Sequence, residues 1–407
     1  MFSPAALLAA SPESVQFPLA MLIVFGSAKL SAEVFERFRQ PGIVGEILAG
    51  ILIGPSVLDW IRPNDFLAAL AQLGVMFLLF HVGLEVKASD LFRVGKTATV
   101  VAVLGVAAPF VLGWGIMRLR GAPSVESIFV GAAMVATSVG ITAEVLSAKG
   151  LMHALATKII LAAAVIDDVL GLLVLAVVTS LARGSVNLAG LALTAAAAVG
   201  FTVLVATWGR RAINHVVPRV EERLRVQEGQ FALSMCLLFG LAVTAMYAGV
   251  AAIVGAFLAG MALSETTGER LHALSSGVSE LLVPFFLVGI GLNFNLRDFG
   301  GSEVLVLSLV IFAAAIVSKL VGCGLGALPL GKADALRIGV GMIPRGEVGL
   351  VVAQIGQSMG VIPQRIYGVV VFMAVATTLI APPLIAAAFR AVPAEKNGEE
   401  AEMVRLG

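Results

Sequence analysis

Two aspartates stand side by side in an apolar run. Asp167 and Asp168 lie in LAAAVIDDVLGLLVLAVV, residues 161–178, which is otherwise uncharged and about as long as the ~20 apolar residues that cross a bilayer. Each carboxylate near the middle of such a span costs roughly 2.5–3.5 kcal/mol on insertion scales, so a cation, a proton or a basic partner must compensate it. The alternative is a pair of structural acids held by neighbouring helices. Adjacent helical residues point about 100° apart, so we expect the two acids to have different roles.

Lys319 is a basic residue placed to compensate one of these acids. It lies in IFAAAIVSKLVGCGLGAL, residues 311–328, and apolar residues extend well beyond it on both sides. In one interpretation its long side chain reaches the membrane surface, as lysines near helix ends do. In the other, which we expect, it forms a buried ion pair with an aspartate and can release its proton when a competing cation arrives.

A second set of polar residues interrupts two other apolar segments. Arg345 and Glu347 are two residues apart, so on one helix they would face nearly opposite sides. At an unwound stretch they can instead offset the partial charges of half-helix ends, which is the role we expect. Thr137, Ser138 and Thr142 can supply oxygen ligands to a hard cation, and we expect Thr137 and Ser138 to do so. The alternative is that these hydroxyls only bond back to their own helix.

The composition is that of a polytopic membrane protein. The chain has 407 residues, 59% hydrophobic and 13% charged, with a mean hydropathy of +1.01. An average soluble domain carries about 25% charged residues. The net charge of +1 gives no reason to expect a nucleic-acid partner. No P-loop, catalytic triad or metal motif occurs in the sequence, so we expect no enzyme activity and no cofactor. The roles of Glu46 and Glu280, which lie within or near apolar segments, are left open.

Apolar runs bounded by charge, Gly or Pro predict an all-α protein with about thirteen membrane-spanning helices. The expected spans are 16–36, 41–55, 66–86, 97–117, 127–148, 154–182, 187–208, 231–248, 250–264, 271–293, 302–328, 334–359 and 364–389. If the N-terminus lies outside, most Lys and Arg of the connections become cytoplasmic, as the positive-inside rule requires. The outer connections then hold only Arg62, Arg118, Arg120, Arg183, Arg297 and Arg365. We therefore expect a multi-pass protein of the cell (inner) membrane with a cytoplasmic C-terminus.

The longest polar connection, residues 210–230, divides the chain into halves. Six spans precede the seventh and six follow it, so the two sets would cross the membrane in opposite orientations, as in an inverted repeat. Such a repeat predicts broken helices at equivalent places. The stretch ATSVGIT at 136–142 interrupts the fifth span, and glycines, Pro344 and charged residues at 339–349 interrupt the twelfth. Each is the fifth span of its half, so we expect two crossed broken helices. Residues 216–226 predict a short amphipathic helix on the cytoplasmic surface.

Five stretches of this chain together resemble one family. The stretches QPGIVGEILAGILIGPSVL (40–58), FLLFHVGLE (77–85), ATSVGITAEVL (136–146), AAVIDDVLGLLVLA (163–176) and GMIPRGEVGLVVA (341–353) resemble the monovalent cation/proton antiporter-2 family. The match runs nearly end to end, and the Asp-Asp pair with a lysine in the eleventh span is similar to the electrogenic NapA-type sodium/proton branch. This resemblance implies that Asp168 is the principal cation ligand and that Asp167 forms an ion pair with Lys319. It also implies the inverted-repeat fold of the NhaA/NapA type.

The resemblance further implies a moving transport core and a dimerisation domain. The expected division places dimerisation helices at 1–95 and 231–300, core helices at 96–183 and 301–390, a linking helix with the cytoplasmic connection at 184–230, and a cytoplasmic tail at 391–407. Small residues in GEILAGILIG and VGAFLAGMALS permit close helix contact in lipid. Together with the resemblance, they predict a homodimer.

The expected function is therefore secondary antiport of Na+ or Li+ against protons by elevator-type alternating access. The cation and the proton would compete for Asp167 and Asp168. Potassium/proton exchange on the same scaffold is the first alternative. Glutathione-gated potassium efflux proteins share several of the motifs, but they typically have a neutral residue before a single aspartate and a nucleotide-binding domain after the last helix. The Asp-Asp pair and the short stretch after Arg390 depart from that pattern.

Two further classes are less consistent with the residues. A sodium symporter of organic anions, similar to bile-acid carriers, would need exposed positive charge and half-helix N-termini without a buried acid pair. A channel would need a filter-like ring sequence, and none is apparent in the chain.

Overall fold

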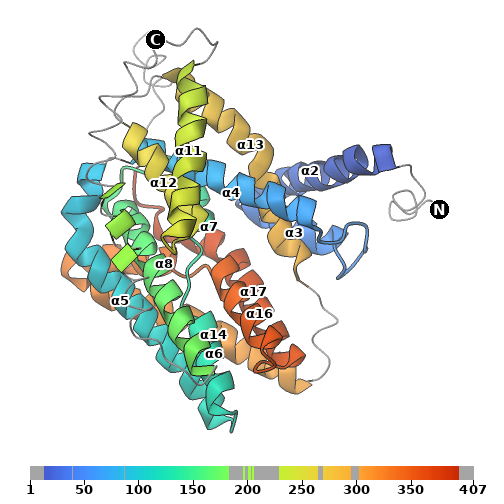
Figure 1. Ribbon diagram of the computed structural model, residues 1–407, viewed down its shortest axis with the longest axis vertical. Helices are drawn as coiled ribbons and strands as arrows, with labels where there is room; N and C mark the ends of the chain where they lie inside the picture. Colours follow the sequence, from blue (N-terminus) through green and yellow to red (C-terminus); the bar gives the residue numbers. More distant parts are fainter. Residues whose placement is uncertain are drawn as a thin grey trace.

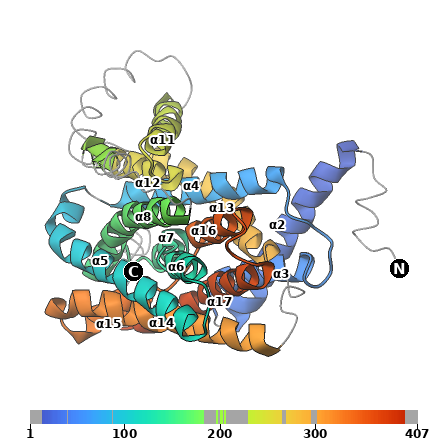
Figure 2. The same cartoon turned by 60° about the horizontal axis from the view of Figure 1, so that its bottom comes forward.

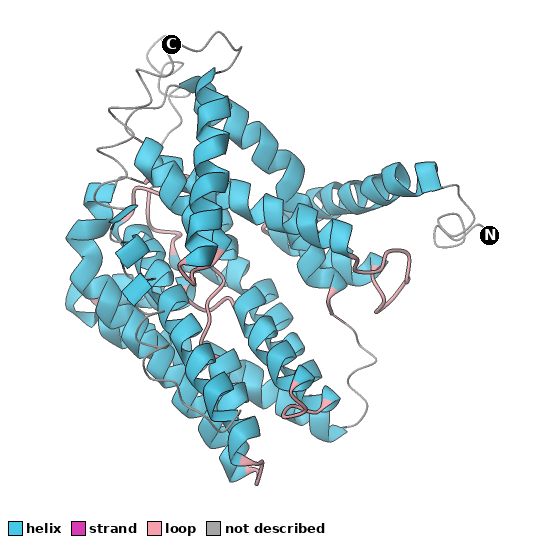
Figure 3. Cartoon of the chain, in the orientation of Figure 1, coloured by secondary structure: helices cyan, strands magenta, loops and turns pink. Residues whose placement is uncertain are grey.

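The computed structural model describes residues 13–38, 40–86, 88–182, 196–197, 200–202, 204–205, 229–264, 269–294 and 302–393. In these ranges the chain forms helices joined by short loops (Figure 3). The main helices are α2 (Glu13–Arg37), α3 (Gly42–Ile53), α4 (Asp65–Glu85), α5 (Ala88–Leu119), α6 (Ser124–Ala133), α7 (Val139–Ala148), α8 (Leu155–Ala182), α11 (Gly229–Tyr247), α12 (Ala252–Leu263), α13 (Glu269–Leu292), α14 (Ser302–Ala327), α15 (Lys332–Gly341), α16 (Glu347–Ser358) and α17 (Gln364–Ala388). The expected all-α class is confirmed.

The helices fall where apolar runs predict membrane spans. Within the described ranges, eight helices are long and apolar enough to cross a membrane. The shorter helices α3, α6, α7, α12 and α16 are also apolar. Among them, α3 and α12 fill the expected spans 41–55 and 250–264, whereas α6, α7 and α16 are halves of interrupted spans. The expected span at 187–208 lies largely outside the described residues, and the expected amphipathic helix at 216–226 lies wholly outside them.

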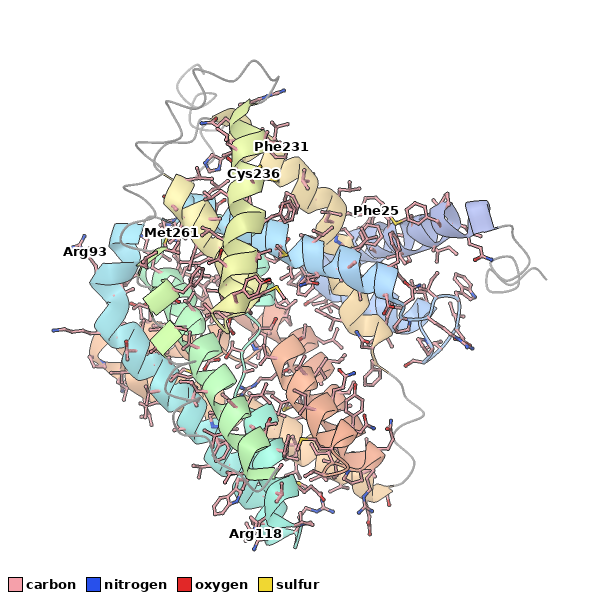
Figure 4. The ribbon with its side chains drawn as sticks, in the orientation of Figure 1. Phe25, Arg93, Arg118, Phe231, Cys236 and Met261 are labelled. Carbon is pink, nitrogen blue, oxygen red and sulfur yellow. The ribbon has the colours of Figure 1, made fainter. Side chains whose placement is uncertain are left out.

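Helix α5 begins at Ala88, well before the expected edge near 97. The expected boundary between residues 95 and 96 therefore falls inside this helix. Arg93 and Arg118 lie near its opposite ends (Figure 4). The 25 steps from Arg93 to Arg118 rise roughly 38 Å at 1.5 Å per residue, more than the ~30 Å of a bilayer core. Hydropathy detects only the part of a helix that lipid surrounds, so it places the start too late.

The helices pack in two groups. Helices α2, α3, α4, α11, α12 and α13, called here the α4 group, contact mainly one another. Helices α5, α6, α8, α14, α15, α16 and α17, called here the α14 group, do the same. In Figure 1, α11 and α12 lie above α14, and in Figure 2 they lie at the opposite edge of the molecule from α14 and α15. The half-helix α7 contacts both groups, through α4 on one side and through α8 and α17 on the other.

Small residues allow close helix contacts inside this chain. A Cβ atom at Gly83 of α4 would collide with the carbonyl oxygen of Phe257 in α12, and one at Gly260 of α12 would collide with the carbonyl oxygen of Phe80. Gly50 of α3 meets the backbone of α13 at Val288 in the same way. Gly50 and Gly260 belong to the stretches from which a homodimer was expected. The contacts that they make here lie within one chain. A small-residue pattern alone does not distinguish a helix of the same chain from one of a partner.

Candidate functional site

Two broken helices cross at the centre of the site. The first break, residues 134–138, separates α6 from α7, and the second, residues 342–346, separates α15 from α16. The backbone N–H of Ser138 donates to the carbonyl oxygen of Pro344 at 2.8 Å. The hydroxyl of Thr142 donates to the carbonyl oxygen of Gly341 at 2.7 Å. The pair of crossed broken helices expected from the repeat is therefore present, and each break satisfies backbone groups of the other.

Asp167 and Lys319 form an ion pair beside the first break. The Nζ atom of Lys319, on α14, lies 2.9 Å from Oδ1 of Asp167, on α8, and both side chains are fully buried. Oδ2 of Asp167 accepts the backbone N–H of Thr137 at 3.0 Å. Each oxygen of this carboxylate is thus held by a donor, as a buried charge requires. The geometry agrees with the expected ion pair, and it leaves the transport role of Lys319 to be proposed.

Asp168 faces a different part of the structure. Its residue is 5% exposed, and its side chain lines a small cavity of about 10 Å3 with Leu79 of α4, Val139 of α7 and Phe257 of α12. A space of ~10–15 Å3 on this measure holds about one water-sized particle. The neighbouring aspartates therefore have different surroundings, as their angular separation on a helix predicts. Asp167 lies against α14, whereas Asp168 lies where α8 and α7 meet the α4 group.

Arg345 is fully buried in the second break and binds the backbone of the first. One of its guanidinium nitrogens, Nη1, donates to the carbonyl oxygens of Met134, Val135 and Ala136, and Nη2 donates to that of Ala315 at 2.9 Å. The carbonyls of Met134, Val135 and Ala136, which follow the end of α6, carry partial negative charge. The arginine therefore compensates the C-terminal end of one half-helix, while Asp167 binds an N–H before the start of the next.

The backbone of Arg345 is held in turn by two threonines of α17. Its N–H donates to Oγ1 of Thr377 at 3.2 Å, and its carbonyl oxygen accepts the hydroxyl of Thr378 at 2.9 Å. Glu347 is the first residue of α16, where an acidic residue suits the partial positive charge of a helix start. The side chain of Glu347 lies outside the described part of the structure. Its expected role in charge compensation therefore stays a prediction.

The two expected oxygen ligands of the first break differ in their surroundings. Thr137 is 6% exposed, and its hydroxyl has no hydrogen-bond partner among the described residues. Because its own N–H binds Asp167, this unsatisfied oxygen lies next to the acid pair. Ser138 instead lines a cavity of about 550 Å3 together with Arg345 and Gly346, called here the apolar cavity. Asp168 does not line that cavity, so its small cavity and the surroundings of Ser138 are separate.

A third cavity, of about 780 Å3, lies at the other end of the α4 group and is called here the acidic cavity. It is lined by Gln40 and Gly42 at the connection of α2 and α3, whereas the apolar cavity is lined by Pro63 and Asn64 at the connection of α3 and α4. Successive connections lie at opposite ends of a helix. The two large cavities therefore open towards opposite sides of the bundle, and Asp168 lines neither of them.

Several residues around the site were not expected to take part. The Thr377–Thr378 pair is visible in the sequence as two adjacent hydroxyls in an apolar helix, but only the fold shows what they bind. Gly105 of α5 faces Lys319, since a Cβ atom there would collide with Sγ of Cys323 and lie 3.4 Å from Nζ of Lys319. A lone glycine in an apolar run gives no signal of such a contact.

A family model and two curated relatives match most of this chain. The family model described as "Sodium/hydrogen exchanger, transmembrane" matches residues 21–391. The chain is 33% identical to the high-affinity Na+/H+ antiporter NhaS3 of Synechocystis sp., over 94% of this chain and 92% of that protein. It is also 33% identical to the Na+/H+-K+ antiporter GerN of Bacillus cereus, over 92% of this chain and 96% of that protein.

The fold is similar to that of a solved structure. The sodium proton antiporter MjNhaP1 of Methanocaldococcus jannaschii superposes with a TM-score of 0.69 and 19% sequence identity, covering 95% of this chain and all of that one. A second structure of the same protein gives a TM-score of 0.64 over 91% of this chain. At this identity the likeness concerns the fold alone.

Proposed function

This chain belongs to the sodium/hydrogen exchanger family, and on that premise we propose that it is a secondary antiporter exchanging sodium for protons at Asp167 and Asp168. The observation that carries the assignment to these residues is the fully buried pair of Asp167 and Lys319 directly beside Asp168. An acid pair of this kind inside an apolar bundle needs a positive charge, and a cation or a proton can supply it.

Asp168 is the residue at which we place sodium. It lines a cavity of about one water-sized particle, and carboxylate oxygens suit a hard cation. The hydroxyl of Thr137, which has no partner among the described residues, is a second oxygen near the acid pair. A protonated carboxyl has lost the charge that attracts sodium, so the two ions exclude each other at this residue. That competition couples sodium movement in one direction to proton movement in the other.

Lys319 is the group that we assign as a second proton carrier. When all three are ionised, Asp167, Asp168 and Lys319 sum to one negative charge, which an arriving sodium neutralises. If Lys319 then gives up its proton, Asp167 keeps the hydrogen bond from the N–H of Thr137. Two protons would move against one sodium, and the exchange would be electrogenic. If Lys319 keeps its proton throughout, the exchange is electroneutral and the lysine only braces the helices.

Movement of the α14 group against the α4 group would give alternating access. The mutual packing of each group supports treating them as two bodies, and the small cavity of Asp168 lies where they meet. The two large cavities at opposite ends supply approaches from the two sides of the membrane. In the orientation favoured by Lys and Arg, with the N-terminus outside, the acidic cavity faces the cytoplasm because it adjoins the connection of α2 and α3.

Potassium is a second candidate cargo, because the relative GerN is named a Na+/H+-K+ antiporter and matches nearly the whole chain. We also propose a homodimer in the cell membrane, with exposed apolar residues of α2 such as Leu22 and Leu30 available to lipid or to a partner. The mass of the protein in lipid nanodiscs tests the homodimer, and a monomeric mass would contradict it.

Proton flux in proteoliposomes tests the function. The purified protein is reconstituted with a pH-sensitive dye inside, and NaCl, LiCl, KCl or choline chloride is added outside. We expect sodium and lithium to drive proton movement with a half-saturating concentration that falls as the pH rises, since fewer protons then compete for Asp168. A response to potassium of equal size would favour the second candidate cargo. No response to any of the three cations would exclude antiport of monovalent cations.

A further inference from the structure

The acidic cavity contains charged groups that the exchange at Asp168 does not use. It is lined by five glutamates, Glu33, Glu36, Glu46, Glu144 and Glu280, and by two lysines, Lys29 and Lys149. The apolar cavity differs, because among the described side chains its lining includes Arg345 and no acid. Only one of the two approaches to the centre therefore attracts cations.

Glu46 is the most deeply buried acid of this lining. It is 5% exposed, and its Oε1 atom accepts a hydrogen bond from Nζ of Lys29 at 3.1 Å. Its Oε2 atom is buried and has no hydrogen-bond partner among the described residues. A buried carboxylate oxygen without a partner is costly, so a further positive group or donor is expected at this atom.

Two other groups of the cavity lining complete the set of oxygens. Ser279 of α13 is 7% exposed, and within the described part of the chain its hydroxyl has no hydrogen-bond partner. Glu144 of α7 is partly buried and lies within the electrostatic reach of both Glu46 and Lys29. Glu46 and Ser279 belong to the α4 group, whereas Glu144 belongs to the half-helix that follows the first break.

We propose that Glu46, Glu144 and Ser279 form a second site for a monovalent cation, separate from the acid pair at the centre. The donors are carboxylate and hydroxyl oxygens, which suit hard cations. When both carboxylates are ionised, they and the Lys29 ammonium sum to one negative charge, which a single monovalent cation neutralises. The identity of the cation as sodium rests on the proposed function.

This site holds the cargo on its way to Asp168 from one side only. The negative charge of this site raises the local concentration of cargo in the acidic cavity and so lowers the sodium concentration needed for half-maximal rate on that side. It leaves the maximal rate unchanged, since saturating sodium fills Asp168 without it. The other side has no equivalent, because the apolar cavity has no acidic side chain among its described lining residues.

Sided transport measurements test the proposal. Everted and right-side-out membrane vesicles present opposite faces to added NaCl, and each carries the parent, Glu46→Gln or Glu144→Gln. The matched control is Glu33→Gln, which removes the same charge from the same cavity at a residue whose side chain is 56% exposed. We expect both site variants to raise the half-saturating sodium concentration on the acidic-cavity side by roughly threefold to tenfold. The maximal rate and the value on the opposite side should not change.

The double variant should be no worse than the single ones, because either substitution already breaks the site. An equal change in Glu33→Gln would overturn the proposal in favour of general surface charge, and so would unchanged values in both site variants. Glu46→Gln and Glu144→Gln are independent tests. If one of these variants melts at a much lower temperature than the parent, the other still tests the proposed site.

Direct binding separates this proposal from the proposed function. Full-length protein carrying Asp168→Asn, which disables the central site, is titrated with NaCl while the 23Na NMR linewidth is recorded. We expect residual sodium binding that Glu46→Gln or Glu144→Gln removes and Glu33→Gln keeps. Absence of residual binding, or binding that survives both site substitutions, would overturn the second site. A parent protein without sodium-driven proton flux would overturn the proposed function instead, whatever this titration shows.

Discussion

The two broken helices occupy equivalent positions in the two halves of the chain, yet they are held differently. The second break contains Pro344, which cannot donate a backbone hydrogen bond, and the threonines of α17 hold the backbone of its neighbour Arg345. The first break contains no proline, and charged groups from elsewhere hold it: the guanidinium of Arg345 at its carbonyl end and the carboxylate of Asp167 at its N–H end.

This difference shows how one half of a repeat depends on the other. The second break contains its own proline, and the described side chains that bond its backbone are neutral hydroxyls. The first break is stabilised by an arginine that comes from the second break and by an aspartate that is itself paired with Lys319 of the second half. Charge compensation therefore runs across the repeat, and the cation site that we propose lies beside the break that is held by charged groups from elsewhere.

The largest effect is expected from Arg345→Gln, because it removes the positive charge that the second break supplies to the carbonyls of the first. Three backbone carbonyls of the first break lose the guanidinium, and each buried unsatisfied group costs about 1–3 kcal/mol, so we expect a destabilisation of ~4 kcal/mol or more. Thermal unfolding of the purified protein measures it. Arg37→Gln on α2 is the matched control, since Arg37 pairs with Glu33 at the exposed surface and should cost under ~1 kcal/mol. Similar melting temperatures for the two variants would contradict this account of the first break.

Lys319→Gln sharpens the comparison, because it removes the other charge supplied by the second half. Breaking a buried ion pair typically costs about 3–5 kcal/mol, and uptake of a proton by Asp167 relieves part of that cost. Sodium binding at Asp168 should be largely kept while one transported proton is lost. The test is the transport rate under an imposed membrane potential, which should rise in the parent and not in the variant. If both forms respond equally to voltage, Lys319 is a structural residue.

The smallest effects distinguish two threonines around the first break. The Thr142 hydroxyl donates to the carbonyl of Gly341, whereas the hydroxyl of Thr137 has no partner among the described residues. Thr142→Ala should lower stability by about 1 kcal/mol and leave the half-saturating sodium concentration unchanged. Thr137→Ala should raise that concentration and hardly change stability. The reverse pattern in melting and flux measurements would remove Thr137 from the proposed cation ligands.

The sequence predicted the elements of this site better than their connections. The apolar runs, the two breaks and the need of Lys319 for a buried acid follow from composition and spacing, because lipid imposes a simple rule on which residues can lie within it. The choice of Asp167 as that acid came from the family resemblance. The direction of the Arg345 side chain towards the first break could not be predicted. It depends on how two segments far apart in the chain cross, and the local sequence around Arg345 carries no information on that crossing.

The small residues and the buried acids also show that local sequence does not predict which distant groups a residue contacts. The glycines of α3 and α12 indicated close helix contacts correctly, and the described contacts lie within the chain, so the homodimer stays a prediction. Glu46 was ambiguous from the sequence, because an acid near the end of an apolar segment can be solvated or buried. Only the fold places it in the acidic cavity with one oxygen lacking a partner among the described residues.

The central claim is that sodium and protons compete for Asp168, and one measurement tests it most directly. Sodium-driven proton flux is recorded in proteoliposomes containing Asp168→Asn, beside the parent and beside Asp65→Asn, which removes an exposed acid at the start of α4. The account predicts parental flux in Asp65→Asn and none in Asp168→Asn, although the latter protein keeps the pair of Asp167 and Lys319 and remains folded. Sodium-driven flux at the parental rate in Asp168→Asn would contradict it.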